Sequence, residues 1–411
     1  MPDFAIKNVF AREVLDSRGN PTVEVEIHTA THRATAIVPS GASTGVHEAL
    51  ELRDGDFRYH GKGVLGAVRN VAKIGQHIVG LDVRKQKEID ELMIKLDGTQ
   101  NKSALGANAI LGVSMCAARL AAMAQDKQLY HYLAELAATT PKLVCPFANV
   151  INGGQHADNE LKIQEFMIVP IGIEKFKERM RAVSEVYHTL KGLLLKLYGK
   201  SATNVGDEGG FAPMIKSAED ALELLQRAIK ESGYQGRLRL AIDAAASYFY
   251  NGESYVLEQS LTREQLVGYW VKLVSIYDIY SLEDPFAEDD FEGFRMLTER
   301  LGDKLQIIGD DLLVTNPERL KIAIQKRACN SLLLKLNQIG TLTEAIQAAK
   351  LAYSAGWKVM VSHRSGETED TFIADLAVAL GCGQIKLGAP CRSERTAKYN
   401  RLLRIAEQFN E

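Results

Sequence analysis

Residues 279–311, IYSLEDPFAEDDFEGFRMLTERLGDKLQIIGDD, decide the fold. An apolar run ends in the ionisable Glu283, a loop and a helical segment follow, and a second apolar run ends before Asp310. This spacing is about the length that a strand, its connecting helix and the next parallel strand require. The stretch therefore predicts one βα unit of a parallel sheet, with an acidic residue at the end of each strand.

The same unit recurs along most of the chain. Short apolar runs occupy residues 162–169, 238–243, 279–283, 305–311, 331–335, 358–363 and 384–386. The ionisable residues at the ends of six runs are Asp243, Glu283, Asp310, Lys335, His363 and Lys386. Apolar runs without alternation are typical of parallel strands buried on both faces, and six or more units predict a closed (β/α)8-type barrel. An open doubly wound sheet is the alternative, but it does not require a polar residue after every strand.

The N-terminal part has a different pattern. Residues 21–28 alternate apolar and polar side chains, as a half-buried strand does, and residues 33–38 are a candidate partner. Helical or buried-helix patterns follow at residues 64–80, 84–96 and 104–136. Strands followed by helices predict a small α+β domain. We place this domain at residues 1–136 and the barrel domain at residues 137–411.

Composition excludes several classes of protein. The 411 residues carry a net charge of −3, which argues against nucleic acid as the main partner. The five cysteines are scattered without a CxxC pair, as in proteins of a reducing compartment. The N-terminus has no apolar signal core, and no long uncharged apolar stretch predicts a membrane span. These features indicate a cytoplasmic protein.

The carboxylates at the strand ends predict a metal site. In βα barrels the active site lies at the carboxyl ends of the strands, so Asp243, Glu283 and Asp310 are expected to converge. Three carboxylates repel one another unless a cation lies between them. Oxygen ligands without cysteine favour a hard ion such as magnesium. Strand alternation would point the neighbouring Asp311 away from this site.

The lysines at strand ends leave two interpretations open. Lys335 and Lys386 could balance the charge of the carboxylates, or one could have a lowered pKa and act as a general base. Glycine-rich segments at residues 152–159 and 204–210 would let the backbone approach a ligand closely. The guanidinium and hydroxyl groups of residues 362–367 suit a phosphate, and a P-loop sequence is absent.

A set of motifs in this order resembles the enolase family. The motifs are SGASTGVHE (40–48), QEFMI (164–168), GDEGG (206–210), EDPF (283–286), GDDL (309–312), LKLNQIG (334–340), SHRSGETED (362–370), QIK (384–386) and GAP (388–390). The resemblance covers the chain from its N-terminal strands to its last helix. The chain departs from the usual family pattern at Tyr248 and Leu387, but not at any position matched to a catalytic residue.

The resemblance implies a fold and a role for each matched residue. The fold would be an α+β domain capping a barrel of modified ββαα(βα)6 order. Lys335 matches the catalytic base and Glu208 the acid, with Glu165 beside it. The matched metal ligands are Asp243, Glu283 and Asp310 for a first Mg2+, with Ser43 in a closing loop for a second. The matched substrate-binding residues are His156, Gln164, Glu165, Lys335, His363, Arg364, Ser365 and Lys386.

The implied activity is the magnesium-dependent, reversible dehydration of 2-phosphoglycerate to phosphoenolpyruvate in glycolysis and gluconeogenesis. Removing a proton next to a carboxylate requires positive charge at that carboxylate, which metal ions and Lys386 would supply; a neutral lysine base with magnesium is a known feature of this superfamily. We expect Glu165 to raise the pKa of Glu208 by repulsion, so that Glu208 can donate a proton. The resemblance also implies a homodimer, with an octamer as the alternative.

Two other functions compete with this one. A different lyase or racemase of the superfamily would often carry a Lys-x-Lys pair on one strand, but position 333 here is Leu333. Such enzymes also lack the Ser43 loop and the phosphate-binding pair Arg364 and Ser365. A purely structural or surface-binding role would relax the catalytic set, which is intact in this sequence.

Overall fold

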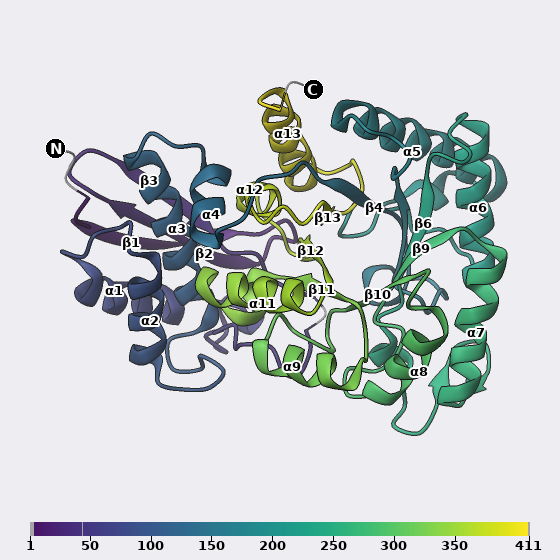
Figure 1. The fold of residues 1–411 in the computed structure, drawn as a ribbon, viewed down its shortest axis with the longest axis horizontal. Coiled ribbons are helices and arrows are strands. Elements are labelled where there is room, and N and C mark those ends of the chain that lie inside the picture. Colours follow the sequence, from purple (N-terminus) through teal and green to yellow (C-terminus); the bar gives the residue numbers. More distant parts are fainter. Residues whose placement is uncertain (1–3, 43, 410–411) are drawn as a thin grey trace.

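The chain folds into two parts, which Figure 1 shows side by side. The computed structural model describes residues 4–42 and 44–409. The N-terminal part contains one small sheet and helices, and the C-terminal part is a closed barrel surrounded by helices. The predicted fold class is confirmed.

The N-terminal sheet has three antiparallel strands in the order β1-β2-β3. The strands are β1 (Asn8–Leu15), β2 (Pro21–His28) and β3 (Arg33–Ile37), and the helices are α1 (Leu65–Ile78), α2 (Gln86–Asp97), α3 (Ala107–Ala124) and α4 (Leu129–Ala137). Val23, Val25 and Ile27 are buried on alternate positions of β2, as the alternating sequence predicts. Helix α3 packs against β2 and β3, while α1 packs against β1.

The barrel closes in the strand order β10-β11-β12-β13-β4-β5-β6-β9. Its strands are β4 (Cys145–Asn152), β5 (Glu165–Val169), β6 (Arg239–Asp243), β9 (Ile279–Glu283), β10 (Gln306–Gly309), β11 (Ser331–Leu334), β12 (Lys358–Ser362) and β13 (Gln384–Lys386). Strand β5 is antiparallel to both β4 and β6, and the remaining pairs are parallel.

The helices around the barrel complete the ββαα(βα)6 order. They are α5 (Phe176–Tyr198), α6 (Ala218–Glu231), α7 (Arg263–Ile276), α8 (Phe291–Leu301), α9 (Pro317–Lys326), α10 (Leu336–Ile339), α11 (Leu342–Ser354), α12 (Phe372–Ala379) and α13 (Ser393–Glu407). Short 3-10 helices lie at η1 (Arg58–Gly61), η2 (Gly154–His156), η3 (Lys200–Thr203) and η4 (Ala246–Phe249), and a two-stranded ribbon joins β7 (Tyr255–Val256) to β8 (Ser260–Leu261).

Side-chain caps mark where several of these helices begin. Ser217, Thr262, Asp290 and Thr341 each accept a backbone N–H three residues on. Such a cap satisfies one of the first amides of a helix, which have no partner within the helix. The sequence therefore specifies the turn from loop to helix locally in several βα units.

Apolar side chains fill the barrel interior. Phe147, Met167, Ile308, Leu333 and Met360 belong to one buried cluster contributed by five different strands. A filled interior is typical of βα barrels, which are packed cores rather than pores. Ligands can therefore enter only at the ends of the barrel.

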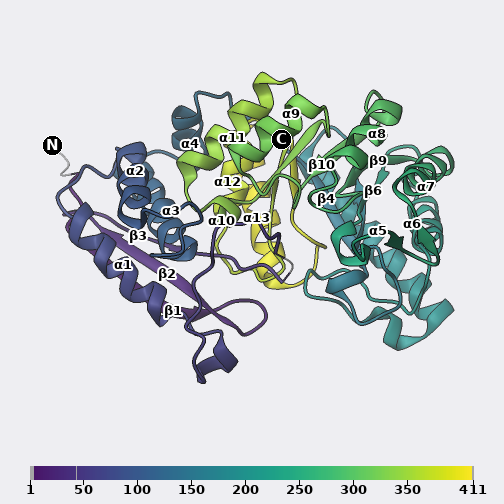
Figure 2. The ribbon, with the colours of Figure 1, turned by 90° about the horizontal axis from the view of Figure 1, so that it is seen from below.

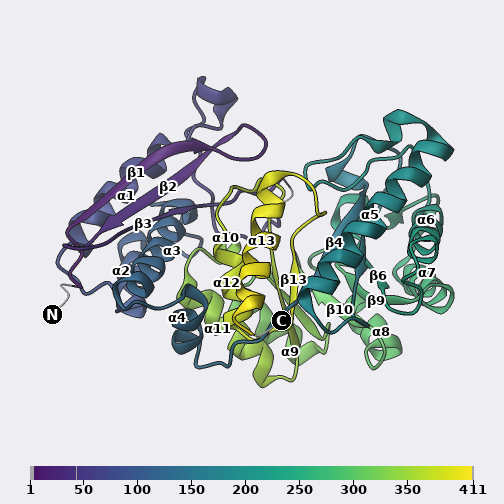
Figure 3. The same cartoon turned by 90° about the horizontal axis from the view of Figure 1, so that it is seen from above.

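Several contacts hold the capping part against the barrel. Ser40 and Gly366 exchange two backbone hydrogen bonds of 2.8 Å, and Arg119 binds Asp370 through both of its terminal nitrogens. Figure 2 shows α10 and α11 next to α2 and α3, and Figure 3 shows α12 beside α4. Helix α3 is apolar and long enough to cross a membrane by composition, but 89% of it is buried inside the protein. This burial identifies it as a core helix.

Candidate active site

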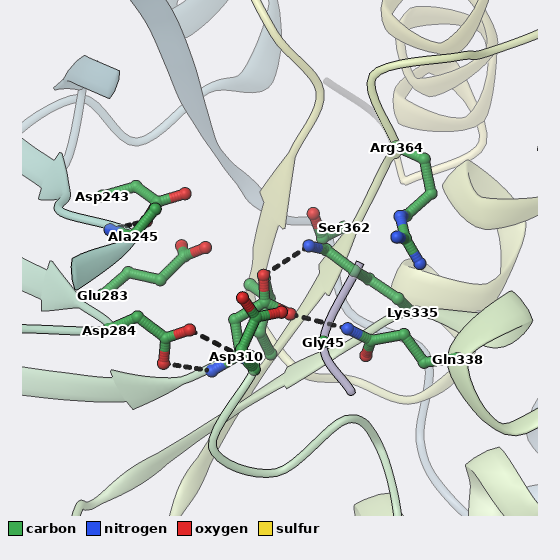
Figure 4. A network of polar contacts seen from close by, with 12 residues as sticks. Gly45, Asp243, Ala245, Glu283, Asp284, Asp310, Lys335, Gln338, Ser362 and Arg364 are labelled. Carbon is green, nitrogen blue, oxygen red and sulfur yellow. Dashed lines mark hydrogen bonds and ion pairs between the residues drawn. The ribbon is translucent and has the colours of Figure 1, made fainter. Parts of the chain in front are cut away.

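The strand ends at one rim of the barrel bring together the ionisable residues that the sequence singled out. Figure 4 shows Asp243, Glu283, Asp310 and Lys335 among them. At or just after the ends of their strands lie Asp243 (β6), Glu283 (β9), Asp310 (β10), Lys335 (β11), His363 (β12) and Lys386 (β13). Because β5 runs in the opposite direction, its first residue, Glu165, lies opposite Asp243 at the same rim. Residues far apart in the sequence therefore form one site.

A small pocket at this rim collects most of the predicted substrate-binding residues. It is lined by His156, Gln164, Glu165, Glu208, Asp243, Lys335, Ser362, His363, Arg364, Ser365 and Lys386. Most of these side chains are buried, including charged ones. Buried charges are stable only when paired or bound to a ligand, so the pairing of each charge is informative.

Lys386 is the counter-charge of three buried carboxylates. Its Nζ atom lies 2.8 Å from Asp243 Oδ2, 2.8 Å from Glu283 Oε1 and 3.1 Å from Glu165 Oε2. Burial alone would lower the pKa of Lys386, but these three carboxylates raise it well above its usual value. Lys386 is therefore a fixed positive charge at the centre of the rim.

Lys335 is bound to a carboxylate rather than to cations. Its Nζ donates to Asp310 Oδ2 at 2.5 Å, while Gln338 donates to the other oxygen of Asp310 at 2.9 Å. Burial would lower the pKa of Lys335, but the Asp310 charge raises it above its usual value. With Asp310 as its nearest charged partner, Lys335 balances the charge of a carboxylate in this arrangement.

A second group of carboxylates lies behind the first. Asp284 accepts the backbone N–H groups of Asp310 and Asp311 at 2.8 and 2.7 Å (Figure 4). Carboxylate oxygens of these three residues lie within 4.8 Å of one another. Strand alternation does not describe Asp311, since β10 ends at Gly309, and Asp311 is not among the residues that line the pocket. Burial, reinforced by Asp311 and Asp310, raises the pKa of Asp284 well above its usual value.

Glu208 accepts a hydrogen bond from one side chain and lies near two histidines. Its Oε2 accepts from Asn149 Nδ2 at 3.0 Å and lies 3.4 Å from His363 Nε2, while its Oε1 lies 3.6 Å from His156 Nδ1. Burial would raise the pKa of Glu208, but His363, His156 and Arg395 lower it well below its usual value. Burial and the Glu208 charge instead raise the pKa of Glu165 well above its usual value.

Within this carboxyl pair, Glu165 is therefore the group with the raised pKa and Glu208 the group with the lowered pKa. We had expected the opposite order, with Glu208 raised by its neighbour. The sequence did not reveal that Asn149 and two histidines converge on Glu208, because the three lie in separate segments of the chain. Like charges at short range separate the two pKa values, and the side chains next to Glu208 decide which of the two is lowered.

The predicted phosphate-binding residues lie under the loop at residues 40–48. Arg364 forms two hydrogen bonds with Glu48, of 2.9 and 3.1 Å, and Ser365 Oγ accepts the Ala42 N–H at 2.6 Å. The loop thus contacts both residues of the predicted phosphate site. Ser43, the predicted ligand of a second metal ion, lies outside the described residues.

The residues at the rim fit a divalent cation. Oxygen donors predominate, and Glu283 Oε2 is a buried acceptor that receives no hydrogen bond from the described residues. Burial and the Asp243 charge raise the pKa of Glu283 well above its usual value. A cation beside these oxygens would relieve this repulsion. Among the described residues, the ligand atoms that lie within 4.8 Å of one another belong to two other groups, Asp284 with Asp310 and Asp311, and His156 with Glu165 and Glu208. Of the three predicted ligands only Asp310 is in such a group, and these acidic clusters are compatible with a metal site.

Comparisons with known proteins identify the family of the chain. The chain matches the enolase N-terminal domain over residues 6–133 and the enolase C-terminal TIM barrel domain over residues 140–411. It is 60% identical over 411 residues to the enolase of Methanopyrus kandleri, covering 98% of this chain and 96% of that one. It is 57% identical over 412 residues to the enolase of Thermococcus kodakarensis, covering 99% and 95%. With both domains matched and such relatives aligned over nearly its whole length, the chain belongs to the enolase family.

Proposed function

We propose that this protein is a phosphopyruvate hydratase, a hydro-lyase that reversibly dehydrates 2-phosphoglycerate to phosphoenolpyruvate in glycolysis and gluconeogenesis. The observation that carries the proposal is the single pocket lined by buried carboxylates, two lysines and the Arg364–Ser365 pair. Relatives named enolase cover nearly the full chain at 57–60% identity. Nothing in the site favours a purely structural or surface-binding role.

We assign the base to Lys335 and the acid to Glu208, with Glu165 beside it. Lys335 and Glu208 line the same pocket, so Lys335 could take the C2 proton of a three-carbon substrate between them. Glu208 could give a proton to the C3 hydroxyl, which would leave as water while the C2–C3 double bond forms. The fixed charge of Lys386 would stabilise the negative charge that develops on the substrate's carboxylate. Proton exchange between Glu165 and Glu208 would supply the proton that leaves with the hydroxyl.

We assign the metal ligands to Asp243, Glu283 and Asp310, with Ser43 as a ligand of a second ion. The proposed ions are two Mg2+, because carboxylate oxygens are the donors that magnesium prefers. When bound, Mg2+ supplies positive charge at the carboxylate of the substrate, which lowers the cost of removing the neighbouring proton. Lys386 already contacts two of the proposed ligands and orients them.

We assign phosphate binding to Arg364 and Ser365, and further substrate contacts to His156, Gln164 and His363. Arginine binds phosphate through two parallel hydrogen bonds, the geometry in which Arg364 holds Glu48 here. Substrate phosphate would share or replace this carboxylate as a partner of the guanidinium. The contact between Ala42 and Ser365 would then couple phosphate binding to closure of the loop, which excludes water from the site.

One assay tests the proposal. Purified protein with magnesium and 2-phosphoglycerate should produce phosphoenolpyruvate, measured by its ultraviolet absorbance, and a chelator should stop the reaction. The Lys335→Ala variant should lose activity by about 10²–10⁴-fold, the usual contribution of a general base, with unchanged circular dichroism. The matched control Lys326→Ala, on the exposed side of α9, should retain full activity. Absence of activity in the wild type with magnesium would reject the proposal.

We also propose a boundary between domains at residues 136 and 137, a homodimer with an octamer as the alternative, and a cytoplasmic location. The two family matches end at residue 133 and begin at residue 140, on either side of the proposed boundary. Light scattering after size-exclusion chromatography would measure the oligomeric state, and a monomer would contradict the proposal.

A further inference from the structure

Arg395, on α13, is a completely buried guanidinium next to the site. Its Nη1 donates to the carbonyl oxygen of Arg364 at 2.6 Å and lies 2.6 Å from His363 Nδ1. Its Nη2 donates to the carbonyl oxygens of Asp207 and Ser365 at 3.1 and 2.6 Å. One side chain therefore bridges the segment before Glu208 and the segment that carries the predicted phosphate-binding pair.

The contact with His363 fixes the direction of a hydrogen bond. An arginine guanidinium has only donors and is not deprotonated in proteins, so His363 Nδ1 must be the acceptor. A neutral imidazole with an unprotonated Nδ1 carries its proton on Nε2. That nitrogen lies 3.4 Å from Glu208 Oε2, so the ring proton is on the side of the imidazole that faces the proposed acid.

We propose that Arg395 is a positioning residue that holds His363 in its Nε2–H tautomer and so presents a fixed N–H donor to Glu208. Loss of the Arg395 contact would leave His363 Nδ1 free to take a proton, and the imidazole could then exist as the other tautomer or as the cation. Either change would alter the donor set of Glu208. The tautomer is a property of the chain itself, whereas its effect on catalysis rests on the proposed function.

The packing around Arg395 leaves little room for another arrangement. Gly388 has a φ of 77°, and a Cβ at this position would lie 2.6 Å from the Glu208 carbonyl oxygen and 3.1 Å from His363 Cε1. The Ala389 N–H also donates to the Glu208 carbonyl at 2.9 Å. Backbone and side chain thus hold His363 and Glu208 in one rigid unit. Burial, with an added contribution from Arg395, also lowers the pKa of His363 to about 4, which agrees with a neutral ring.

Nitrogen-15 NMR of the imidazole rings tests the proposal in the metal-free, full-length wild type. The chain has nine histidines, and the His363→Gln variant identifies the signal of His363. We expect the chemical-shift pattern of the Nε2–H tautomer, unchanged between pH 8 and pH 5.5. A pattern of the Nδ1–H tautomer, or of an imidazolium at pH 7, would overturn the proposal without any variant having to fold.

A pair of variants on the same helix then tests the role of Arg395. Arg395→Lys keeps the charge but loses the fork that reaches several acceptors at once, so His363 should show a mixture of tautomers or titrate within this pH range. Arg404→Lys, at an exposed position of α13, should leave the His363 signals unchanged. A wild-type pattern in folded Arg395→Lys protein would also overturn the proposal.

The same samples separate this inference from the proposed function. Wild-type protein that lacks activity on 2-phosphoglycerate but shows the Nε2–H pattern would refute the function and support the tautomer assignment. Active protein with the Nδ1–H pattern would refute only the tautomer assignment. In an active enzyme, Arg395→Lys should lower kcat by about 10–100-fold, the usual effect of losing a partner that orients a histidine in an active site, and shift the pH profile.

Discussion

Replacing Lys386 by methionine would remove the only ammonium group that contacts three buried carboxylates among the described residues. Methionine keeps much of the volume and the flexibility of lysine, so the change isolates the charge. Asp243, Glu165 and Glu283 would then face one another without this cation. We expect a folded but strongly destabilised protein when no metal is present.

The magnitude follows from the burial of these groups. Removing one partner of a buried ion pair typically costs about 3–5 kcal/mol, because a buried charge is left uncompensated. The pKa values of Glu165 and Glu283 are already raised well above 4.5 in the native protein, and the loss of Lys386 would raise them further. A carboxyl group with a raised pKa favours the folded state when it is protonated. The loss of unfolding free energy in Lys386→Met, relative to the wild type, should therefore grow as the pH rises above about 4.5 and shrink in more acidic solution.

Urea unfolding followed by circular dichroism would measure this effect between pH 5 and pH 8 in the presence of a chelator. The control is Lys358→Met on the neighbouring strand β12, whose exposed ammonium contacts the Tyr280 hydroxyl. The control should lose less than about 1 kcal/mol. A Lys386→Met protein as stable as the control, or with a deficit that does not depend on pH, would refute this account of the rim.

Three further predictions concern neighbouring residues. His363 should contribute a loss of about 3 kcal/mol of stability as the pH falls from 6.5 to 4, since burial lowers its pKa from 6.5 to about 4 and each unit is worth about 1.4 kcal/mol. The difference in stability between the wild type and His363→Gln, measured by thermal unfolding, should therefore change by this amount over the range, and a constant difference would contradict the assignment. Gln338→Ala removes a donor to Asp310 and should weaken magnesium binding about 10–100-fold by calorimetry; unchanged affinity would count against Asp310 as a ligand. Gly388→Ala should lower stability by more than about 1 kcal/mol and reduce activity, because its Cβ meets the Glu208 carbonyl; normal urea unfolding would show that the contact relaxes easily.

The barrel strands could be predicted because short, continuous apolar runs are typical of strands that are buried on both faces of a sheet. Strands β10 and β11 are buried at every position, so they read as continuous apolar runs. The ionisable residue after each run marked the strand end that faces the pocket. The regular spacing of these units then left a closed barrel as the simplest arrangement.

Two strands were missed for physical reasons. Strand β1 is exposed or half-buried along its whole length, and its sequence NVFAREVL therefore lacks a clear apolar face. Strand β4 is fully buried, but its sequence CPFANVIN contains a proline and two asparagines. Asn149 stands there because it binds Glu208, a function that single-sequence patterns do not show.

The pairing of charges was the least predictable part of the site. The order of the units predicted that Lys335 and Asp310 follow adjacent strands. It did not predict that the two side chains contact each other at 2.5 Å. Whether a buried lysine has a raised or lowered pKa depends on which charge lies nearest. Arg395 also lacks a local signal, because its acceptors are backbone carbonyls that only the folded chain brings together.

Barrel closure by β13 on β4, with Gln384 opposite Cys145, sets the order in which a nascent chain can mature. At about 5–20 residues per second, ribosomes need roughly 10–50 s to travel from the first of these strands to the last. During that interval the edge of β4 has no neighbour, and Asp243 and Glu283 are made before Lys386 exists. Translation that stops before β13 would leave an open sheet with clustered acids, so late termination defects should yield aggregates or protease substrates rather than partly active enzyme.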